Sequence, residues 1–340
     1  MDKETIQQVK NLLQSPKNIT IIGHKNPDGD AIGSCLALGE ILKVTEHTVT
    51  VMMPNDFPHF LKWLPQCENI VIYEQAIEKS KEIIDNSNLI FTLDFNALSR
   101  VGNLGDVLMK ATADFIMIDH HQAPDDYAVA MYSDTSMSST CEMVYHFATS
   151  LELQHTFNKD IATQIYTGIM TDTGSFRFPA TTAITHTVIA HLVALGANGA
   201  LIHQNIYNTK SPEQLQLLGV ALKNLVVLKE FNTAYITLSQ KELDDHKFKK
   251  GDTEGFVNYA LSVNGIKFAV IFIENKQESI VKISFRSKGD FSVNEFARNH
   301  YSGGGHNNAA GGKSDLSLAD TVTEFISILS SYKEKLINAH

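Results

Sequence analysis

An apolar run that stops abruptly at three polar side chains constrains this chain more than any other stretch. The run from Ile116 to Ile118 is followed at once by Asp119, His120 and His121. A short, continuous apolar run bounded by polar residues is typical of a buried strand in an α/β sheet. We therefore expect this carboxylate and both imidazoles at the carboxyl end of a strand, where open α/β sheets bind their ligands.

Two further predicted strands, 20–23 and 88–93, end in the same kinds of side chain. The polar residues that follow them are His24, Asp28 and Asp30 after the first strand and Asp94 after the second. If the three strands are parallel, all of these side chains meet at one rim of the sheet. Carboxylates gathered there would repel one another unless cations neutralised them, so the pattern predicts a metal site.

The segment between His24 and the next predicted helix, 31–43, reads as a tight strand-to-helix loop because Pro27 disfavours helix before it. Gly29 and Gly33 would let a ligand approach the backbone there, with the first helical N–H groups facing it. For an isolated D-x-D sequence in a loop, an Asx-turn that caps the helix is the more common explanation. The nearby histidine is what favours a metal site.

Two later segments keep alternatives open. A predicted helix, 159–170, leads into Asp172, which is either a fourth site carboxylate or a turn-forming residue before Gly174. Ser139 and Glu142 fit the S-x-x-E capping box at the start of another helix, so capping explains the hydroxyls around them.

The second half of the chain changes character after a largely helical stretch, 181–228, which is broken at 196–199 and 211–212. We predict a connecting helix over 212–229, because it opens with serine followed by proline. Strands are expected at 234–238, 268–273 and 280–285, the last two as a hairpin, and a closing helix at 316–337. The chain is thus expected to be an α/β protein whose smaller second domain follows a helical linker.

A glycine-rich segment, 302–313, lies between the hairpin and the closing helix. Its sequence is too specific for a flexible linker, so we predict a backbone nest that holds a phosphate group. Its expected members are the amides of Gly303, Gly304 and Gly305 and the ring of His306. Arg286, at the end of the preceding strand, would supply positive charge.

Composition narrows the function further. With 340 residues and 43% hydrophobic content the chain suits two globular domains. No apolar run reaches about 18 residues and the start lacks a signal-peptide layout, so we expect a cytoplasmic protein without membrane contact. Three dispersed cysteines argue against disulfides and cysteine-ligated zinc. The 28 basic and 38 acidic residues, net charge -10, disfavour long nucleic acids as partners but allow a short phosphorylated substrate.

Taken in order, these motifs resemble the DHH phosphoesterase superfamily, named after the triplet found here at 119–121. The resemblance covers essentially the whole chain, and the segment 303–311 is similar to the glycine motif of the associated C-terminal domain. Within the superfamily the chain looks most like the bacterial nanoRNase group. That group degrades very short oligoribonucleotides and often removes the 3'-phosphate of adenosine 3',5'-bisphosphate.

The resemblance implies a DHH catalytic domain at 1–195, a helical linker at 196–229 and a DHH-associated substrate-binding domain at 230–340. It implies two divalent cations. One would be held by His24, Asp28 and Asp94, and the other by Asp30, Asp94, His120 and Asp172. Mixed oxygen and imidazole donors suit Mn²⁺, with Mg²⁺, Co²⁺ or Zn²⁺ as competitors.

The same resemblance assigns the remaining roles. Asp119 would orient the imidazoles, and His121 would contact the phosphate and protonate the leaving oxygen. Arg286, His306 and the glycine amides would bind the terminal phosphate or nucleotide. A homodimer through the N-terminal domain is a family-level expectation.

Three alternatives to the nanoRNase reading stay open at this point. Linear breakdown products of cyclic dinucleotides, pApA or pGpG, are alternative substrates. A manganese-dependent inorganic pyrophosphatase has a similar N-terminal site but lacks the G-G-G-H cluster. A nucleotide-sensing module without turnover would be expected to have lost a ligand, whereas every ligand position is filled here.

Overall fold

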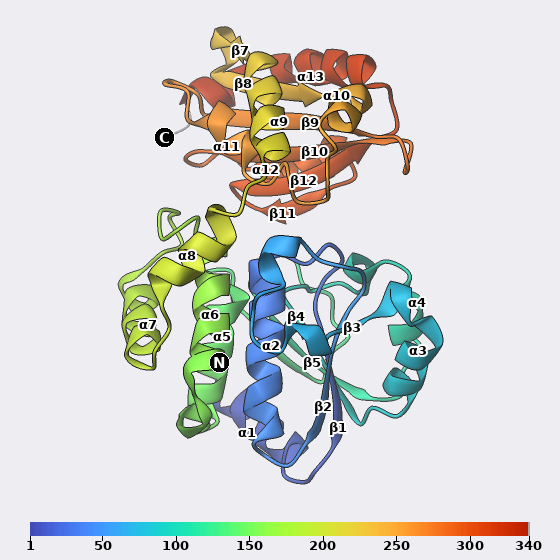
Figure 1. The fold of residues 1–340 in the computed structure, drawn as a ribbon, viewed down its shortest axis with the longest axis vertical. Coiled ribbons are helices and arrows are strands. Elements are labelled where there is room, and N and C mark those ends of the chain that lie inside the picture. Colours follow the sequence, from blue (N-terminus) through green and yellow to red (C-terminus); the bar gives the residue numbers. More distant parts are fainter. Residues whose placement is uncertain (339–340) are drawn as a thin grey trace. The chain divides into compact units, whose positions relative to one another are not determined.

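A computed structural model describes residues 1–338 (Figure 1), which form two compact units. The first spans Met1–Thr209, and the second begins at Lys210. Of the segment 196–229 that we predicted as a helical linker, helix α8 (Gly199–Tyr207) lies in the first unit and helix α9 (Pro212–Lys223) in the second. The last two residues of the predicted domain 230–340 lie outside the described residues.

The first unit is built on a six-stranded parallel sheet with the order β3-β2-β1-β4-β5-β6. Its strands are β1 (Asn18–Ile22), β2 (Thr48–Met53), β3 (Val71–Ile72), β4 (Leu89–Leu93), β5 (Asp114–Asp119) and β6 (Ala130–Ser133). The chain runs outward from β1 to β3 and then returns to place β4 on the other side of β1. The carboxyl ends of β1 and β4 are therefore the switch point at which such sheets bind ligands.

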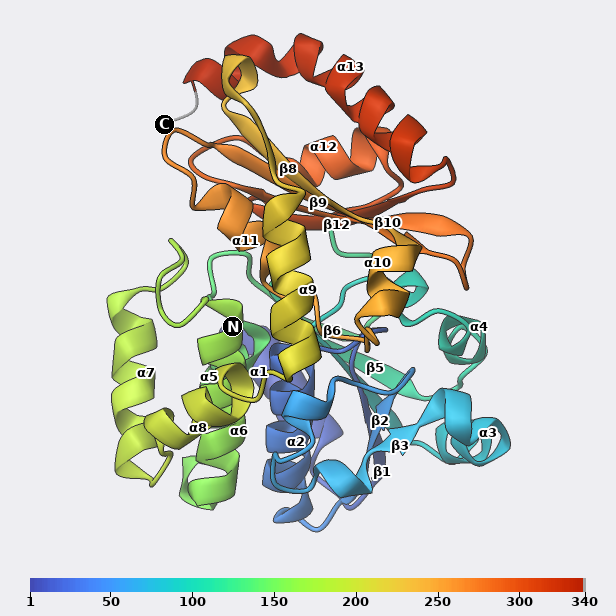
Figure 2. The same ribbon diagram turned by 45° about the horizontal axis from the view of Figure 1, so that its top comes forward.

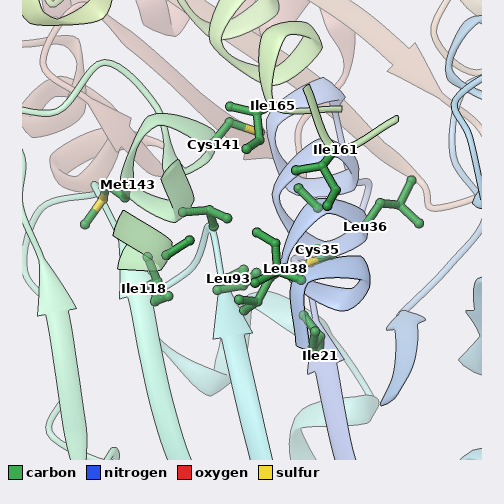
Figure 3. Close-up of a cluster of buried hydrophobic side chains, with 14 of the residues drawn as sticks. Ile21, Cys35, Leu36, Leu38, Leu93, Ile118, Cys141, Met143, Ile161 and Ile165 are labelled. Atoms are coloured by element: carbon green, nitrogen blue, oxygen red, sulfur yellow. The ribbon is translucent and has the colours of Figure 1, made fainter. Parts of the chain in front are cut away.

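Successive residues of these strands pack on opposite faces of the sheet, as the two-residue period of a strand requires. Ile21, Leu93 and Ile118 point toward one helical layer (Figure 3), whereas Ile22 and Ile90 belong to the core on the other face. The first layer contains α1 (Lys3–Leu12), α2 (Gly29–Lys43), α5 (Thr140–Ser150), α6 (Lys159–Asp172) and α7 (Ala183–Ala194). The second contains α3 (Ile77–Asp85) and α4 (Leu104–Leu108).

Helices α2 and α6 pack unusually closely through glycines. A Cβ atom added to Gly29 would lie 2.4 Å from the hydroxyl of Thr171, and one added to Gly33 would lie 2.5 Å from the carbonyl oxygen of Gln164. We expected these two glycines to open the backbone to a ligand, and that prediction is wrong. The space beside each is filled by α6, which brings the end of that helix against the start of α2.

The second unit has a six-stranded mixed sheet with the order β11-β12-β10-β9-β8-β7, in which β8 and β9 are parallel. Its strands are β7 (Val226–Leu228), β8 (Thr233–Leu238), β9 (Phe268–Asn275), β10 (Ile280–Ser287), β11 (Gly304–His306) and β12 (Ala309–Ser314). The predicted hairpin of β9 and β10 is present.

Helices cover both faces of this second sheet (Figure 2). One core gathers aromatic residues such as Phe268, Phe285 and Phe325 under α12 (Val293–His300) and α13 (Leu318–Asn338). The other packs Ile236 and Ile271 against α9, α10 (Gln240–Asp245) and α11 (Phe256–Leu261). The predicted α/β class, a parallel-sheet domain followed by a smaller α/β domain, is confirmed.

Two local predictions in this unit are wrong. The helix predicted over 212–229 ends at Lys223, because the β-branched and apolar residues Val226 to Leu228 pair with β8 as an antiparallel edge strand. The glycine-rich segment is a hairpin rather than a nest, since Gly304–His306 pairs with β12. Glycine permits this pairing because a Cβ at Gly303 would lie 2.0 Å from the carbonyl oxygen of Gly311.

Among the described residues, no single helix has the length and apolar character needed to cross a membrane. Helices α7 and α8 meet that test only as a pair, and their axes are bent by 103° at the break between them.

Candidate metal centre

Asp94 is the centre of the rim formed by the carboxyl ends of β1, β4 and β5. Its Oδ2 lies 3.5 Å from Nε2 of His24, and its Oδ1 lies 3.6 Å from Nε2 of His120 and 3.8 Å from Nδ1 of His121. The residue adopts a left-handed backbone with φ of 64°, and its N–H donates to the carbonyl oxygen of Ile118.

Both interpretations of the D-x-D sequence, a helix cap and a group of metal ligands, agree with the structure at the start of α2. Asp28 is the N-cap, and its Oδ1 accepts hydrogen bonds from the N–H groups of Asp30 and Ala31. The same oxygen lies 3.9 Å from Nε2 of His24. Asp30 is buried in the first helical turn, with its Oδ2 3.8 Å from Nε2 of His120.

Asp172 is the last residue of α6, and its Oδ2 lies 3.6 Å from Nε2 of His120. It is therefore a helix-end residue aimed at the rim. Among the described residues, two of the groups whose donor atoms all lie within 4.8 Å of one another are His24, Asp28 and Asp94, and Asp30, His120 and Asp172. The first has the members of one ligand set that the resemblance implies, and the second has three of the four members of the other, without Asp94.

The first turn of α5 contributes to the rim in a way that we missed from the sequence. The N–H groups of Thr140 and Cys141 donate to the two carboxylate oxygens of Asp30, at 2.6 Å and 2.8 Å. The hydroxyl of Thr140 also donates to Oδ1 of Asp94, at 3.1 Å. The positive end of a helix thus fixes one carboxylate, and one hydroxyl orients the central one.

The turn before α5 is held by a buried carboxylate. Ser139 caps the helix by accepting from the N–H of Glu142, but the predicted reciprocal capping box is absent. The side chain of Glu142 instead accepts hydrogen bonds from the hydroxyls of Ser138 and, at 3.0 Å, Thr185 of α7. The next residue toward the N-terminus, Met137, places its carbonyl oxygen 3.2 Å from Nδ1 of His120. The only sequence signal for this arrangement was the S-x-x-E motif.

Burial and neighbouring charges shift the pKa values of the rim residues in different directions. Burial would raise the pKa of Asp94, but hydrogen bonds with His120 and His24 outweigh it and hold that pKa well below its usual range. Burial would lower the pKa of His24, yet Asp94 and Asp28 raise it to about 9. For Asp30, burial and repulsion from Asp94 and Asp172 together raise the pKa well above normal. Without cations, the cluster keeps protons to limit its negative charge.

The donor set fits a pair of divalent cations. Four carboxylates and two imidazoles converge on the rim, and the two compact groups share the neighbourhood of one central carboxylate. Oxygen and imidazole donors in this ratio suit first-row divalent ions and Mg²⁺. Two such ions would offset four carboxylate charges. Without them, bound protons reduce the negative charge of the cluster.

Asp119 and His121 form a tight pair beside the cluster. Oδ1 of Asp119 lies 2.7 Å from Nδ1 of His121, and its Oδ2 accepts the N–H of His121 at 2.8 Å. Both side chains are buried, and Asn96 donates to the carbonyl oxygen of His121. These contacts fix the orientation of the ring, with its Nδ1 turned toward Asp119.

The predicted substrate-binding residues of the second unit share one part of its sheet. Arg286 on β10 is paired with Ala309 on β12, which is paired in turn with His306 on β11. Directly paired residues of antiparallel strands present their side chains on the same face. The arginine and the histidine therefore flank a small alanine, and Gly304 and Gly305 lie in the edge strand beside them.

Comparisons with known proteins agree with this geometry. Residues 18–169 match the DHH family N-terminal domain, and residues 230–335 match the DHHA1 domain. The chain is 31% identical to the bifunctional oligoribonuclease and PAP phosphatase NrnA of Bacillus subtilis, over 89% of this chain and 94% of that protein. It is 30% identical to the NrnA of Thermus thermophilus, over 98% of this chain and 94% of that protein.

A solved structure gives the same picture. The crystal structure of an exopolyphosphatase-related protein from Bacteroides fragilis is 36% identical in sequence and superposes with a TM-score of 0.93, covering 98% of each chain. The fold and the rim thus define a metal-dependent phosphoesterase, a phosphoric ester hydrolase. The chain belongs to the DHH family and carries both the DHH and the DHHA1 domains. The pyrophosphatase and sensor alternatives are not favoured.

Proposed function

We propose that this phosphoesterase hydrolyses short oligoribonucleotides to mononucleotides and removes the 3'-phosphate of adenosine 3',5'-bisphosphate. The observation that carries the proposal is the convergence of four carboxylates and two imidazoles at the switch point of the parallel sheet. The substrate class is supported by relatives named bifunctional oligoribonuclease and PAP phosphatase, which match almost the whole chain.

Two ions, for which Mn²⁺ suits the donors best, would be held by the rim. His24, Asp28 and Asp94 form one set, and Asp30, Asp94, His120 and Asp172 form the other, so Asp94 belongs to both. Bound cations would supply a water of lowered pKa and would offset the negative charge of the phosphoryl group. Two carboxylates of the second set, Asp30 and Asp94, are oriented by hydrogen bonds from the first turn of α5, which prepares the site before binding.

His121 is proposed as the proton donor. The carboxylate of Asp119 fixes its Nδ1 side, so Nε2 is the atom that can contact the reacting phosphate. As water adds to phosphorus and the bond to the leaving oxygen breaks, a proton from His121 would go to that oxygen. Asp119 stabilises the protonated ring while the proton is present. Arg286 and His306, together with Gly304 and Gly305 of the edge strand, are proposed to bind another part of the substrate. The N–H of Gly303 donates to the carbonyl oxygen of Ala297 at 3.3 Å and is left out of this proposal.

The test is turnover by the purified full chain with Mn²⁺ on three substrates in parallel: pApA, adenosine 3',5'-bisphosphate and pyrophosphate. Asp119→Ala should abolish hydrolysis of both nucleotides. Asp114→Ala is the matched control, because Asp114 lies exposed at the other end of the same strand. Cleavage of pyrophosphate alone would refute the proposed substrate class, and equal activity of both variants would refute the assigned role of Asp119.

A further inference from the structure

Arg100 differs from the other arginines of the chain. It lies in a short 3-10 helix, Leu98–Val101, and is half-buried, yet its side chain makes no hydrogen bond or ion pair within residues 1–338. Arg177, Arg286 and Arg298 each donate a side-chain hydrogen bond inside their own unit. A half-buried guanidinium is normally matched by an anionic or carbonyl acceptor, so its donors are available for a ligand.

The position of Arg100 ties it to the metal centre. The loop that carries it starts at Asp94, and its carbonyl oxygen accepts the N–H of Lys25 at 2.9 Å. Lys25 follows His24 directly, so this hydrogen bond joins the ends of β1 and β4. The guanidinium is close enough to His24 that it acts with burial to lower the pKa of that ring, against the stronger effect of the aspartates.

Lys25 supplies a second cation at the same place. Its side chain lies across Gly102, where an added Cβ would meet Cδ of the lysine at 3.2 Å and Nζ at 3.7 Å. The glycine has φ of 61°, a left-handed conformation that other residues rarely adopt. Lys25 is exposed and, like Arg100, has no side-chain partner among the described residues. Two adjacent loops, one after β1 and one after β4, thus each present a cation that has no carboxylate partner among the described residues.

In this chain of net charge -10, four lysines of the first unit, Lys10, Lys43, Lys62 and Lys81, are paired with carboxylates, whereas others, Lys25 among them, have no carboxylate within 4.0 Å among the described residues. We propose that Arg100 and Lys25 form an anion subsite for a phosphate group of the nucleotide that is not hydrolysed. Arg100 offers a planar set of donors, and Lys25 adds a point charge. The inference rests on the proposed function and deepens it, because it adds a phosphate contact within the first unit.

The test compares adenosine 3',5'-bisphosphate with adenosine 3'-monophosphate, which lacks the second phosphate. Arg100→Gln and Lys25→Met should each raise KM for the bisphosphate about tenfold, while kcat changes little, because one charge-assisted contact is lost. Values for the monophosphate should stay at the wild-type level. Lys81→Met, which removes an exposed lysine paired with Glu78 on α3, is the control. Unchanged KM for the bisphosphate, or equal losses on both substrates, would overturn the subsite.

A binding measurement separates this inference from the proposed function. If the wild-type chain hydrolyses neither nucleotide, the proposed function fails, and calorimetric titration of the Mn²⁺-loaded full chain with pyrophosphate then decides the subsite. Weaker binding by Arg100→Gln, with unchanged manganese content, supports it. Binding as tight as that of the wild type, or a loss of manganese from the variant, overturns it.

Discussion

The two units differ in how deeply their central polar groups are buried. At the rim of the first, Asp30, Asp94 and Asp119 are at most 2% exposed and come from separate elements that the fold brings together. In the second, Arg286 and His306 are half-buried and lie on strands of a single sheet. Buried charges must be matched within the protein, whereas half-exposed ones are stabilised by water. We infer that the first unit holds its polar groups in a fixed geometry suited to chemistry, and that the second offers adjustable contacts suited to substrate binding.

Removing the central carboxylate should have the largest effect. Asp94→Asn keeps the size of the side chain but removes the charge that both donor groups share, so we expect kcat to fall by about a thousandfold or more. Steady-state kinetics with Mn²⁺ and metal analysis of the purified variant measure the loss. Glu152→Gln, which alters an exposed ion pair with Lys10, is the control. A fall in kcat of less than tenfold would contradict the view that the buried rim, rather than the second unit, carries the chemistry.

Removing the charge of the buried Glu142, which holds the turn before α5, should have an intermediate effect on metal binding. Glu142→Gln removes the charge that accepts from Ser138 and Thr185 and so loosens the turn before α5. Contacts that orient ligands are typically worth about 10- to 100-fold in metal affinity or activity. We expect manganese affinity, measured by calorimetry, to fall within that range. Thermal denaturation serves as a check, and an affinity equal to that of the wild type would show that the turn is rigid without this carboxylate.

The second unit should respond in KM rather than in kcat. Arg286→Ala is expected to raise KM for the nucleotide substrates about tenfold, as loss of one charged contact would, while manganese content stays unchanged. Lys282→Ala, on the same strand and paired with exposed Glu278, is the matched control. A fall in kcat with constant KM would mean that this region takes part in the chemical step.

The smallest expected effect is the pH dependence of the metal-free protein. The pKa of His24 is raised to about 9, and those of His120 and Asp30 are raised as well. The folded state therefore holds more protons than the unfolded chain, and the stability that His24 gains is complete below pH 6.5 and is lost as the pH rises through 9. Thermal denaturation of the metal-free chain should show a falling midpoint over that range. A midpoint that rises with pH would contradict this assignment.

The sequence predicted the polar residues of the rim better than the residues that orient them. Abrupt changes from apolar strands to Asp and His are visible without a structure, because strand ends of a parallel sheet share one edge. The contacts of Thr140 with Asp94 and of Cys141 with Asp30 span many residues along the chain, and no local pattern encodes them. The S-x-x-E motif was assigned to capping because a local partner was available, whereas the tertiary partner Thr185 was not visible.

The glycine-rich segment was misassigned for a different reason. Local propensity favours turns and nests for glycine, but pairing with β12 gives the backbone hydrogen-bond partners along one side of the edge strand β11. The same limit applies to Gly29 and Gly33, which were read as access for a ligand and prove to be places where helices meet.

The contact between α2 and α6 has a consequence for how this enzyme can vary. Gly168 of α6 faces the site as well, where an added Cβ would lie 2.7 Å from Oδ1 of Asp30. Asp30 and Asp172 are carried by these two helices, so the separation of the carboxylates depends on how closely the helices pack. The carbonyl oxygen of Gln164 lies beside Gly33, and the side chain of Thr171 lies beside Gly29. A side chain added at either glycine would displace one helix from the other. We therefore expect related sequences to differ in their loops and in the second sheet, and to keep the distance between the carboxylates of the rim.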